Sequence, residues 1–253
     1  MSTDATKKLV YVANWKMNMP AIQSTEWFAK HYEALSELGR TERIVICPTV
    51  PALFPLYSMI LAKEQQTIML GAQDCSVHAG GPFTGQIAAE DLKAIGAQFC
   101  ILGHSESRTL LADTSITVAR KCARALEHYM LPIVCIGETA QERAAGNTLE
   151  VLEGQLEPVL KILTETMAPM NFIAYEPVWA IGSGVTPTPE EIAAVFDHLK
   201  NLIPANLPGL HLLYGGSVTS KNAPELKKIA LLSGFLVGNA SLDFQEFKKI
   251  VEC

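Results

Sequence analysis

Phe172-Ile173-Ala174-Tyr175-Glu176-Pro177-Val178-Trp179-Ala180-Ile181-Gly182-Ser183-Gly184 runs from an apolar segment onto one carboxylate, and then into a Pro- and Gly-containing segment. The apolar part predicts a short buried strand with Glu176 at its carboxyl end. The residues after it indicate a loop with hinge-like positions and accessible backbone N–H groups. An acid at a strand end, followed by such a loop, is the arrangement that a general base beneath a closing lid requires.

Seven other apolar runs of similar length lie along the chain. Most lack alternation between apolar and polar residues, as strands buried on both faces should. The eight runs are Leu9–Ala13, Ile44–Cys47, Ile68–Ala72, Phe99–Leu102, Ile133–Ile136, Phe172–Tyr175, Leu210–Tyr214 and Phe235–Val237. We expect each run to form one strand.

Amphipathic helical patterns separate these runs. One predicted helical face carries Ile116, Ala119, Cys122, Ala123 and Leu126, and a second carries Leu149, Leu152, Leu156, Val159 and Leu163. A third helix should begin at Thr188-Pro189-Glu190-Glu191, because this stretch supplies an N-cap residue, a Pro at the first helical position and acids near the helix N-terminus.

Strand-then-helix units repeated about eight times indicate parallel strands joined by right-handed crossovers. Eight units close naturally into a barrel, so the predicted fold is α/β, a single (β/α)8 TIM barrel with parallel strands. An open doubly wound sheet is the competing architecture. No linker or change of composition divides the chain, so we expect one barrel domain over residues 1–253, with residues 1–8 as a mobile polar extension.

Composition and charge exclude several classes of protein. The chain is 49% hydrophobic over 253 residues, which is ample for one large core. A net charge of -6 without a Lys/Arg cluster argues against a nucleic-acid partner, although helix N-termini and one Lys could still bind phosphate. The six cysteines show no metal-ligand spacing and predict buried free thiols in a reducing compartment. No apolar run approaches the ~18 residues of a membrane span, so we expect no membrane partner and a cytoplasmic location.

Reactive groups of a barrel gather where its strands end and its loops begin. Five of the predicted strands end in motifs with polar or glycine residues. These motifs are Asn14-Trp15-Lys16, Gly103-His104-Ser105-Glu106, Glu176, Tyr214-Gly215-Gly216-Ser217 and Gly238-Asn239-Ala240-Ser241.

Taken together and in this order, the five motifs resemble those of the triosephosphate isomerase family, from about Val10 to Leu242. The resemblance implies interconversion of dihydroxyacetone phosphate and D-glyceraldehyde 3-phosphate, a step of glycolysis and gluconeogenesis. It also implies a homodimer formed through the loop Gln73–Gln86. The chemistry needs no metal and no organic cofactor, and the sequence shows no ligand set for either.

The resemblance gives five residues a part in the reaction. Glu176 would be the base, and His104 would be the neutral electrophile that stabilises the enediolate oxygen. Lys16 would supply fixed positive charge, with Asn14 positioning both the oxygen and Lys16. Glu106 would pair with Lys16 and orient its loop.

The resemblance also places the substrate phosphate. Gly182, Ser217, Gly238 and Asn239 would bind it through backbone N–H groups, aided by a short helix that starts near Asn239. The glycine pair Gly215-Gly216 also fits a simple tight turn. Cys135 matches a family position, and we expect it to pack near the base.

Three departures from the family's usual pattern stand out. Asn239 replaces a glycine, and we expect it to tolerate a left-handed backbone so that its N–H still faces the phosphate. Pro187 replaces the Ala that is frequent at the end of the lid, which predicts a stiffer hinge. Gln86 and Ser107 replace a Glu and an Arg that commonly pair across the dimer, and we expect the dimer to persist without that ion pair.

Two other functions remain open. Sugar-phosphate and indole-phosphate synthases share the phosphate site after the last two strands, but would not be expected to carry the first three motifs as well. A catalytically silent barrel could act as a binding protein. Silencing usually removes the base or the electrophile, and Glu176 and His104 are both present.

Overall fold

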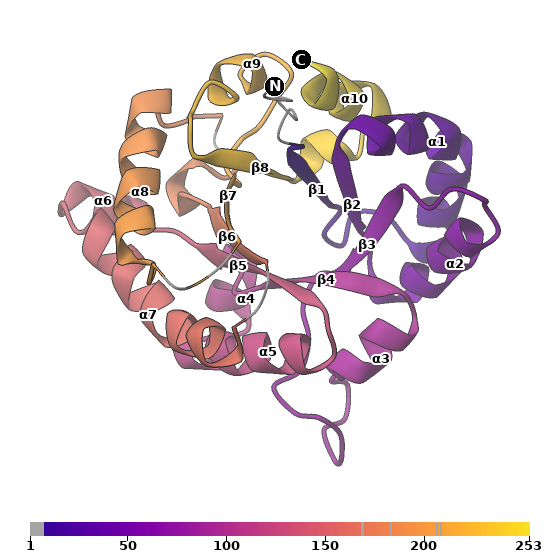
Figure 1. Ribbon diagram of the computed structural model, residues 1–253, viewed down its shortest axis with the longest axis horizontal. Helices are drawn as coiled ribbons and strands as arrows, with labels where there is room; N and C mark the ends of the chain where they lie inside the picture. Colours follow the sequence, from indigo (N-terminus) through magenta and orange to yellow (C-terminus); the bar gives the residue numbers. More distant parts are fainter. Residues whose placement is uncertain (1–7, 168–169, 183, 206, 208) are drawn as a thin grey trace, which may run out of the picture.

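Eight parallel strands form a closed barrel in the computed structural model, which describes residues 8–167, 170–182, 184–205, 207 and 209–253. The strands follow one another around the barrel in chain order, and the helices surround them as an outer ring (Figure 1). The strands are β1 (Val10–Asn14), β2 (Arg43–Cys47), β3 (Ile68–Ala72), β4 (Ala97–Leu102), β5 (Leu131–Ile136), β6 (Asn171–Tyr175), β7 (Leu210–Tyr214) and β8 (Leu232–Val237). The predicted (β/α)8 fold is confirmed.

Helices connect the successive strands, and several loops carry an additional short helix. The α-helices are α1 (Ala21–Thr41), α2 (Val50–Leu61), α3 (Ala89–Ala94), α4 (Ser105–Leu110), α5 (Ser115–Glu127), α6 (Ala140–Ala144), α7 (Thr148–Thr166), α8 (Pro189–Leu202), α9 (Ala223–Leu226) and α10 (Phe244–Glu252). Two 3-10 helices, η1 (Val178–Ala180) and η2 (Asn239–Ser241), lie directly after β6 and β8.

Pairing between β1 and β8 closes the barrel, with Val10 opposite Gly234. A Cβ on Gly234 would lie 1.9 Å from the carbonyl oxygen of Val10, so only glycine allows this approach. The competing prediction of an open doubly wound sheet is therefore wrong. The strand predicted at Phe235–Val237 is too short, since β8 begins at Leu232. Ser233 and Gly234 interrupt the apolar pattern at the start of the strand.

Buried side chains form two layers, one inside the barrel and one between the strands and the helices. Alternate residues of a strand face opposite layers, as Val10 and Val12 lie in the inner cluster while Tyr11 and Ala13 lie in the outer one. Both layers are apolar, which explains why the strand sequences show no alternation.

The helix predictions are correct in most details. Thr188 and Glu191 form a capping box at the start of α8, with Pro189 as its first residue. The predicted face of α7 is wrong at Leu149, which is 43% exposed, and the predicted face of α5 is wrong at Ile116, which is 61% exposed. This residue precedes the buried Val118 by two positions, about 200° around a helix, so it points away from the strands.

All six cysteines fall within the described residues and are free thiols, five of them buried and Cys253 exposed. The extension expected over residues 1–8 lies outside the described residues, except for Lys8, whose ammonium donates to the carbonyl of Arg40 at 2.6 Å. No helix in the described ranges is long and apolar enough to cross a membrane.

Candidate active site

A cavity of about 240 Å³ opens where the strands end, and side chains from five strand ends line it. Eight of the nine residues predicted from the sequence border this cavity, and the ninth, Glu106, contacts two of them, Lys16 and His104. The eight are Asn14, Lys16, His104, Glu176, Gly182, Ser217, Gly238 and Asn239.

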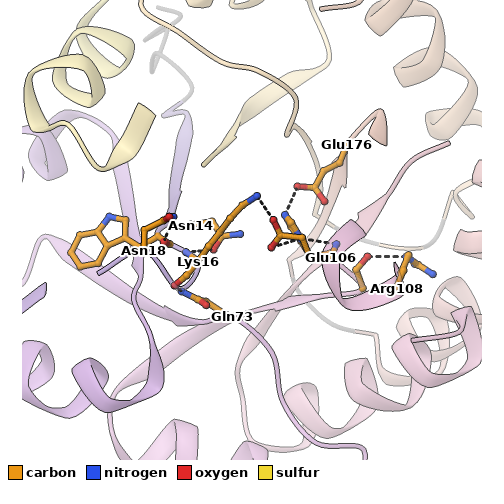
Figure 2. Close-up of polar contacts among 10 residues, drawn as sticks. Asn14, Lys16, Asn18, Gln73, Glu106, Arg108 and Glu176 are labelled. Atoms are coloured by element: carbon orange, nitrogen blue, oxygen red, sulfur yellow. Dashed lines mark hydrogen bonds and ion pairs between the residues drawn. The ribbon is translucent and has the colours of Figure 1, made fainter. Parts of the chain in front are cut away.

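Lys16 enters the cavity from a strained backbone. Its φ of 52° lies in the left-handed region, which costs a residue with a side chain roughly 1–2 kcal/mol. Two amide side chains hold this conformation: Asn14 Oδ1 accepts the Lys16 N–H at 3.1 Å, and Gln73 Nε2 donates to the Lys16 carbonyl at 2.7 Å. Figure 2 shows Asn14 and Gln73 beside the Lys16 backbone, while its side chain extends away from them.

The Lys16 ammonium forms an ion pair with Glu106 Oε1, at 2.5 Å. The two side chains approach each other across the site from the loop after β1 and from the first turn of α4 (Figure 2). The Lys16 side chain is 21% exposed, so its charge is available to a ligand in the cavity.

His104 is buried and serves as the N-cap residue of α4. Its Nδ1 accepts the backbone N–H of Glu106 at 3.2 Å, so this nitrogen carries no proton in the contact. The neutral ring then carries its proton on Nε2, which lies 3.4 Å from Glu176 Oε1. The fold thus presents a neutral N–H donor next to a carboxylate.

Glu176 follows β6 and is 3% exposed. Its backbone N–H donates to the carbonyl of Ile136 at 2.8 Å, which fixes the residue to the end of β5. Its Oε2 is buried and has no hydrogen-bond partner among the described residues. Glu176 also lines the cavity, so a ligand bound there would contact this residue.

Gly215 leaves room for the Glu176 side chain. A Cβ at this position would lie 2.6 Å from Glu176 Cγ and 3.1 Å from Oε1. Gly215 does not have a positive φ, so this close approach, rather than a turn that only glycine can adopt, explains the residue.

Cys135 lies buried inside the barrel near Glu176. Burial raises the pKa of its thiol, and the neighbouring carboxylate of Glu176 raises it further. The thiol therefore stays protonated and packs near Glu176. Arg108 links the ends of β4 and β5, because its guanidinium donates to the carbonyls of Gly103 at 2.8 Å and Cys135 at 3.1 Å.

Asn239 differs from the expectation for its backbone. It begins the 3-10 helix η2 and is not among the described residues with positive φ, so the left-handed conformation predicted for it is wrong. The helical start itself lies where it was predicted, beside Gly238 in the cavity wall. After the neighbouring strand β7, Ser217 Oγ donates to the carbonyl of Ala180 at 2.7 Å.

Sequence reasoning missed two polar residues that support the site. Gln73 holds Lys16, as described above, but was recognised only as the start of a loop. Glu138 is fully buried after β5, and its Oε1 accepts from Trp179 Nε1 at 2.8 Å and from the Tyr175 hydroxyl at 3.2 Å. Both residues follow a strand end closely, so the rule that found His104 could have found them.

In the part of the chain that the structure describes, no group of three or more His, Cys, Asp or Glu side chains could hold a metal ion. The site instead combines a buried carboxylate, a neutral imidazole and a lysine. In a (β/α)8 barrel, this set of side chains at the carboxyl ends of the strands is typical of an enzyme that uses general acid–base catalysis.

Comparison with known proteins narrows the class. The family profile described as Triosephosphate isomerase matches residues 9–253. Relatives named triosephosphate isomerase include those of Aquifex aeolicus (strain VF5), 38% identical over 94% of this chain and 96% of the relative, and of Bordetella pertussis (strain Tohama I), 39% identical over 99% of each. A further relative of that name, from Ralstonia nicotianae, is 40% identical over 97% of this chain and 98% of its own length. The chain belongs to the triosephosphate isomerase family.

Proposed function

We propose that this chain is an isomerase that interconverts dihydroxyacetone phosphate and D-glyceraldehyde 3-phosphate through an enediolate, in glycolysis and gluconeogenesis. Membership of the family supports the reaction. The observation that carries the chemical assignment is the 3.4 Å approach of His104 Nε2 to Glu176 Oε1, in a cavity that Lys16 also enters.

Glu176 is the base in this proposal. It takes a proton from the carbon next to the substrate carbonyl and returns it to the adjacent carbon, since one carboxylate can reach both positions. Its Oε2 has no hydrogen-bond partner among the described residues, so this oxygen is free to accept the proton. The division of work between this Glu and a neutral His is the one already described for the family.

His104 and Lys16 stabilise the negative oxygen of the enediolate. His104 donates from Nε2, because its Nδ1 is occupied by the Glu106 N–H. Lys16 contributes a positive charge in a partly desolvated cavity, where it acts more strongly than in water. Asn14 and Glu106 are positioned to orient the Lys16 backbone and its ammonium.

The phosphate of the substrate binds to backbone N–H groups of Gly182, Ser217, Gly238 and Asn239. All four residues border the cavity, and Lys16 is near enough to add its charge, since a Cβ on Gly238 would lie 3.7 Å from Lys16 Cε. Small or short side chains at these positions let phosphate oxygens approach the backbone closely.

The proposal extends to the assembly and its surroundings. The whole chain, residues 1–253, is one barrel domain, and two copies form a cytoplasmic homodimer through the loop Gln73–Gln86. This loop projects from the body of the barrel between β3 and α3 (Figure 1), and its Phe83 is 37% exposed.

A coupled assay that follows glyceraldehyde 3-phosphate tests the function. The parent chain should turn over the substrate quickly without added metal, and Glu176→Gln should lose several orders of magnitude in kcat while remaining folded by circular dichroism. An inactive parent chain would contradict the isomerase proposal. An active Glu176→Gln variant would remove this residue from the role of base.

A further inference from the structure

Arg143, on the short helix α6, contacts one residue near the start of the loop 177–187 and one residue just after its end. Its guanidinium carbon lies 4.0 Å from the centroid of the Trp179 ring, near the start of this loop. Its Nη2 lies 2.7 Å from Oε1 of Glu191, which belongs to the first turn of α8 just after the loop. One side chain therefore joins the two ends of the segment that follows Glu176.

The start of the loop is held on two sides. The Trp179 indole N–H donates to the buried Glu138 at 2.8 Å, while Arg143 covers the face of the ring. A planar guanidinium can stack on an aromatic face and still donate along its edge, which an ammonium cannot do equally well. Because Trp179 lies three residues after Glu176, its position bears on the backbone that carries the base.

The end of the loop is held by the same carboxylate that contacts Arg143. Glu191 Oε2 accepts the backbone N–H of Thr188 at 2.8 Å, and Glu191 Oε1 accepts from Arg143. The Thr188 N–H lowers the pKa of Glu191, and Arg143 lowers it further, so the carboxylate is ionised at neutral pH. One oxygen of Glu191 thus caps the N-terminus of α8, and the other binds Arg143.

We propose that Arg143 is a positioning residue that couples the two ends of the loop 177–187 and thereby sets how this loop moves over Glu176 during turnover. The inference rests on the proposed function, since it gives the loop a part in the isomerase cycle. Both side chains of the ion pair are exposed by more than a third, and such pairs contribute little to global stability. The coupling is therefore expected in loop motion and kinetics.

Two single variants remove the link from opposite ends. Arg143→Met removes the charge and keeps an unbranched apolar side chain against Trp179. Glu191→Gln removes the ion pair but keeps an oxygen that can accept the Thr188 N–H in a capping box. The double variant tests whether the two side chains act together.

Lys63→Met is the matched control. Lys63 also combines an ion pair with a ring contact, since its Nζ lies 2.7 Å from Glu33 Oε1 and 4.7 Å from the Tyr32 ring centroid. It lies between α2 and β3, at the opposite end of the barrel from the cavity.

Two measurements decide the inference. Incorporation of 5-fluorotryptophan gives a fluorine NMR signal for Trp179, with Trp15 and Trp27 as internal references, and the coupled assay gives kcat and KM. We expect Arg143→Met and Glu191→Gln each to change the exchange rate of the Trp179 signal about threefold or more and to lower kcat/KM about tenfold. The double variant should match either single variant within about twofold, and Lys63→Met should match the parent.

Unchanged Trp179 exchange and unchanged kcat/KM in both single variants would overturn the inference, as would fully additive effects in the double variant. If Arg143→Met does not fold, Glu191→Gln still decides it. A parent chain without isomerase turnover would contradict the proposed function, whereas the Trp179 signal would still show whether Arg143 couples the ends of the loop.

Discussion

At the scale of single residues, two glycines, Gly137 and Gly215, leave the space that Glu176 occupies. A Cβ on Gly215 would overlap Glu176 Cγ, and a Cβ on Gly137 would lie 1.8 Å from the Glu176 carbonyl oxygen. The backbone of three strand ends can therefore approach the proposed base closely. Any added methyl group must displace either this carboxylate or the backbone that carries it.

Gly215→Ala should therefore impair catalysis far more than folding. A displacement of the carboxylate by about 1 Å is expected to lower kcat about 100-fold. Steady-state kinetics and thermal unfolding of the same preparation measure the two effects. Gly154→Ala is the control, because a Cβ there, on helix α7, meets open space.

The control should keep the parent kcat and gain about 0.5–1 kcal/mol of stability, since alanine suits a helix better than glycine. A kcat of Gly215→Ala within threefold of the parent would show that the contact with Glu176 does not matter.

At the scale of elements, a buried cluster joins α5 to two loops. The Lys121 ammonium lies 2.7 Å from Asp74, after β3, and 2.7 Å from Asp113, between α4 and α5. Burial lowers the pKa of Lys121, but the hydrogen bonds to Asp113 and Asp74 outweigh it and raise this pKa above its ordinary value. Burial raises the pKa of Asp74 in spite of the ion pair, so the lysine gains more from the cluster than Asp74 does.

Lys121→Met should leave two carboxylates without their cation and lower the free energy of unfolding by about 3 kcal/mol, as removal of one partner of a buried ion pair does. Urea unfolding at neutral pH measures this difference. A loss of unfolding free energy below about 0.5 kcal/mol would contradict this, because it would show that solvent compensates the two carboxylates for the lost ammonium.

The same variant carries a prediction about pH. A lysine whose pKa is higher in the folded than in the unfolded state stabilises the fold below its unfolded value of 10.5, and this contribution is lost as the pH rises through the folded value. The stability difference between the parent and Lys121→Met should therefore be constant from pH 7 to about pH 10 and shrink above it. A difference that grows above that pH would contradict the sign of the shift.

Pro187 belongs to the end of the loop 177–187 and is buried. Because proline fixes its own φ and restricts Thr186, Pro187→Ala should speed the exchange of this loop, by about threefold, while the chemical step is unchanged. NMR relaxation dispersion measures the exchange. Pro189→Ala is the control, since Pro189 lies two residues further on, as the first residue of α8. Unchanged exchange in both variants would rule out a stiffer hinge.

The sequence predicted elements better than it predicted contacts between them. Each strand lies over its apolar run because both faces of the strand are buried, as for Ile68–Ala72, whose predicted bounds are those of β3. The contacts of Arg143 with Trp179 and Glu191 join residues of separate elements, and no local pattern reveals them. The position of Gln73 after a strand end could be predicted, but its hydrogen bond to the Lys16 carbonyl could not, since Lys16 is distant in the chain.

At the scale of the whole molecule, closure between β1 and β8 brings the two ends of the chain to one site. Lys16, after β1, thereby faces Gly238, after β8. The motifs could predict that these residues meet, because strand ends of a closed barrel share one face. The distances among them come from packing that the motifs do not encode.

The proposed dimer is a whole-molecule prediction. Large apolar side chains are exposed on the loop after β1 and at the end of α4, with Met17 at 91%, Leu110 at 76% and Leu111 at 68%. Burial of such a surface against a second copy is favourable without the ion pair that Gln86 and Ser107 cannot form. Analytical ultracentrifugation at micromolar concentration should give twice the 27.5 kDa of the chain.

Phe83→Asp, in the projecting loop, should shift this equilibrium towards the monomer, because it places a charge in the proposed interface. A parent chain that sediments as a monomer would count against the dimer.

Proton abstraction by Glu176 is the central claim, and isomerisation of dihydroxyacetone phosphate in D₂O tests it most directly. We predict that the parent chain yields glyceraldehyde 3-phosphate with deuterium at C2 in part of the product, because exchange of the abstracted proton with solvent competes with its return to the substrate while it is held on the carboxylate. Glu176→Gln should form this product several orders of magnitude more slowly. A product without deuterium, or one formed at the parent rate by Glu176→Gln, would contradict the account.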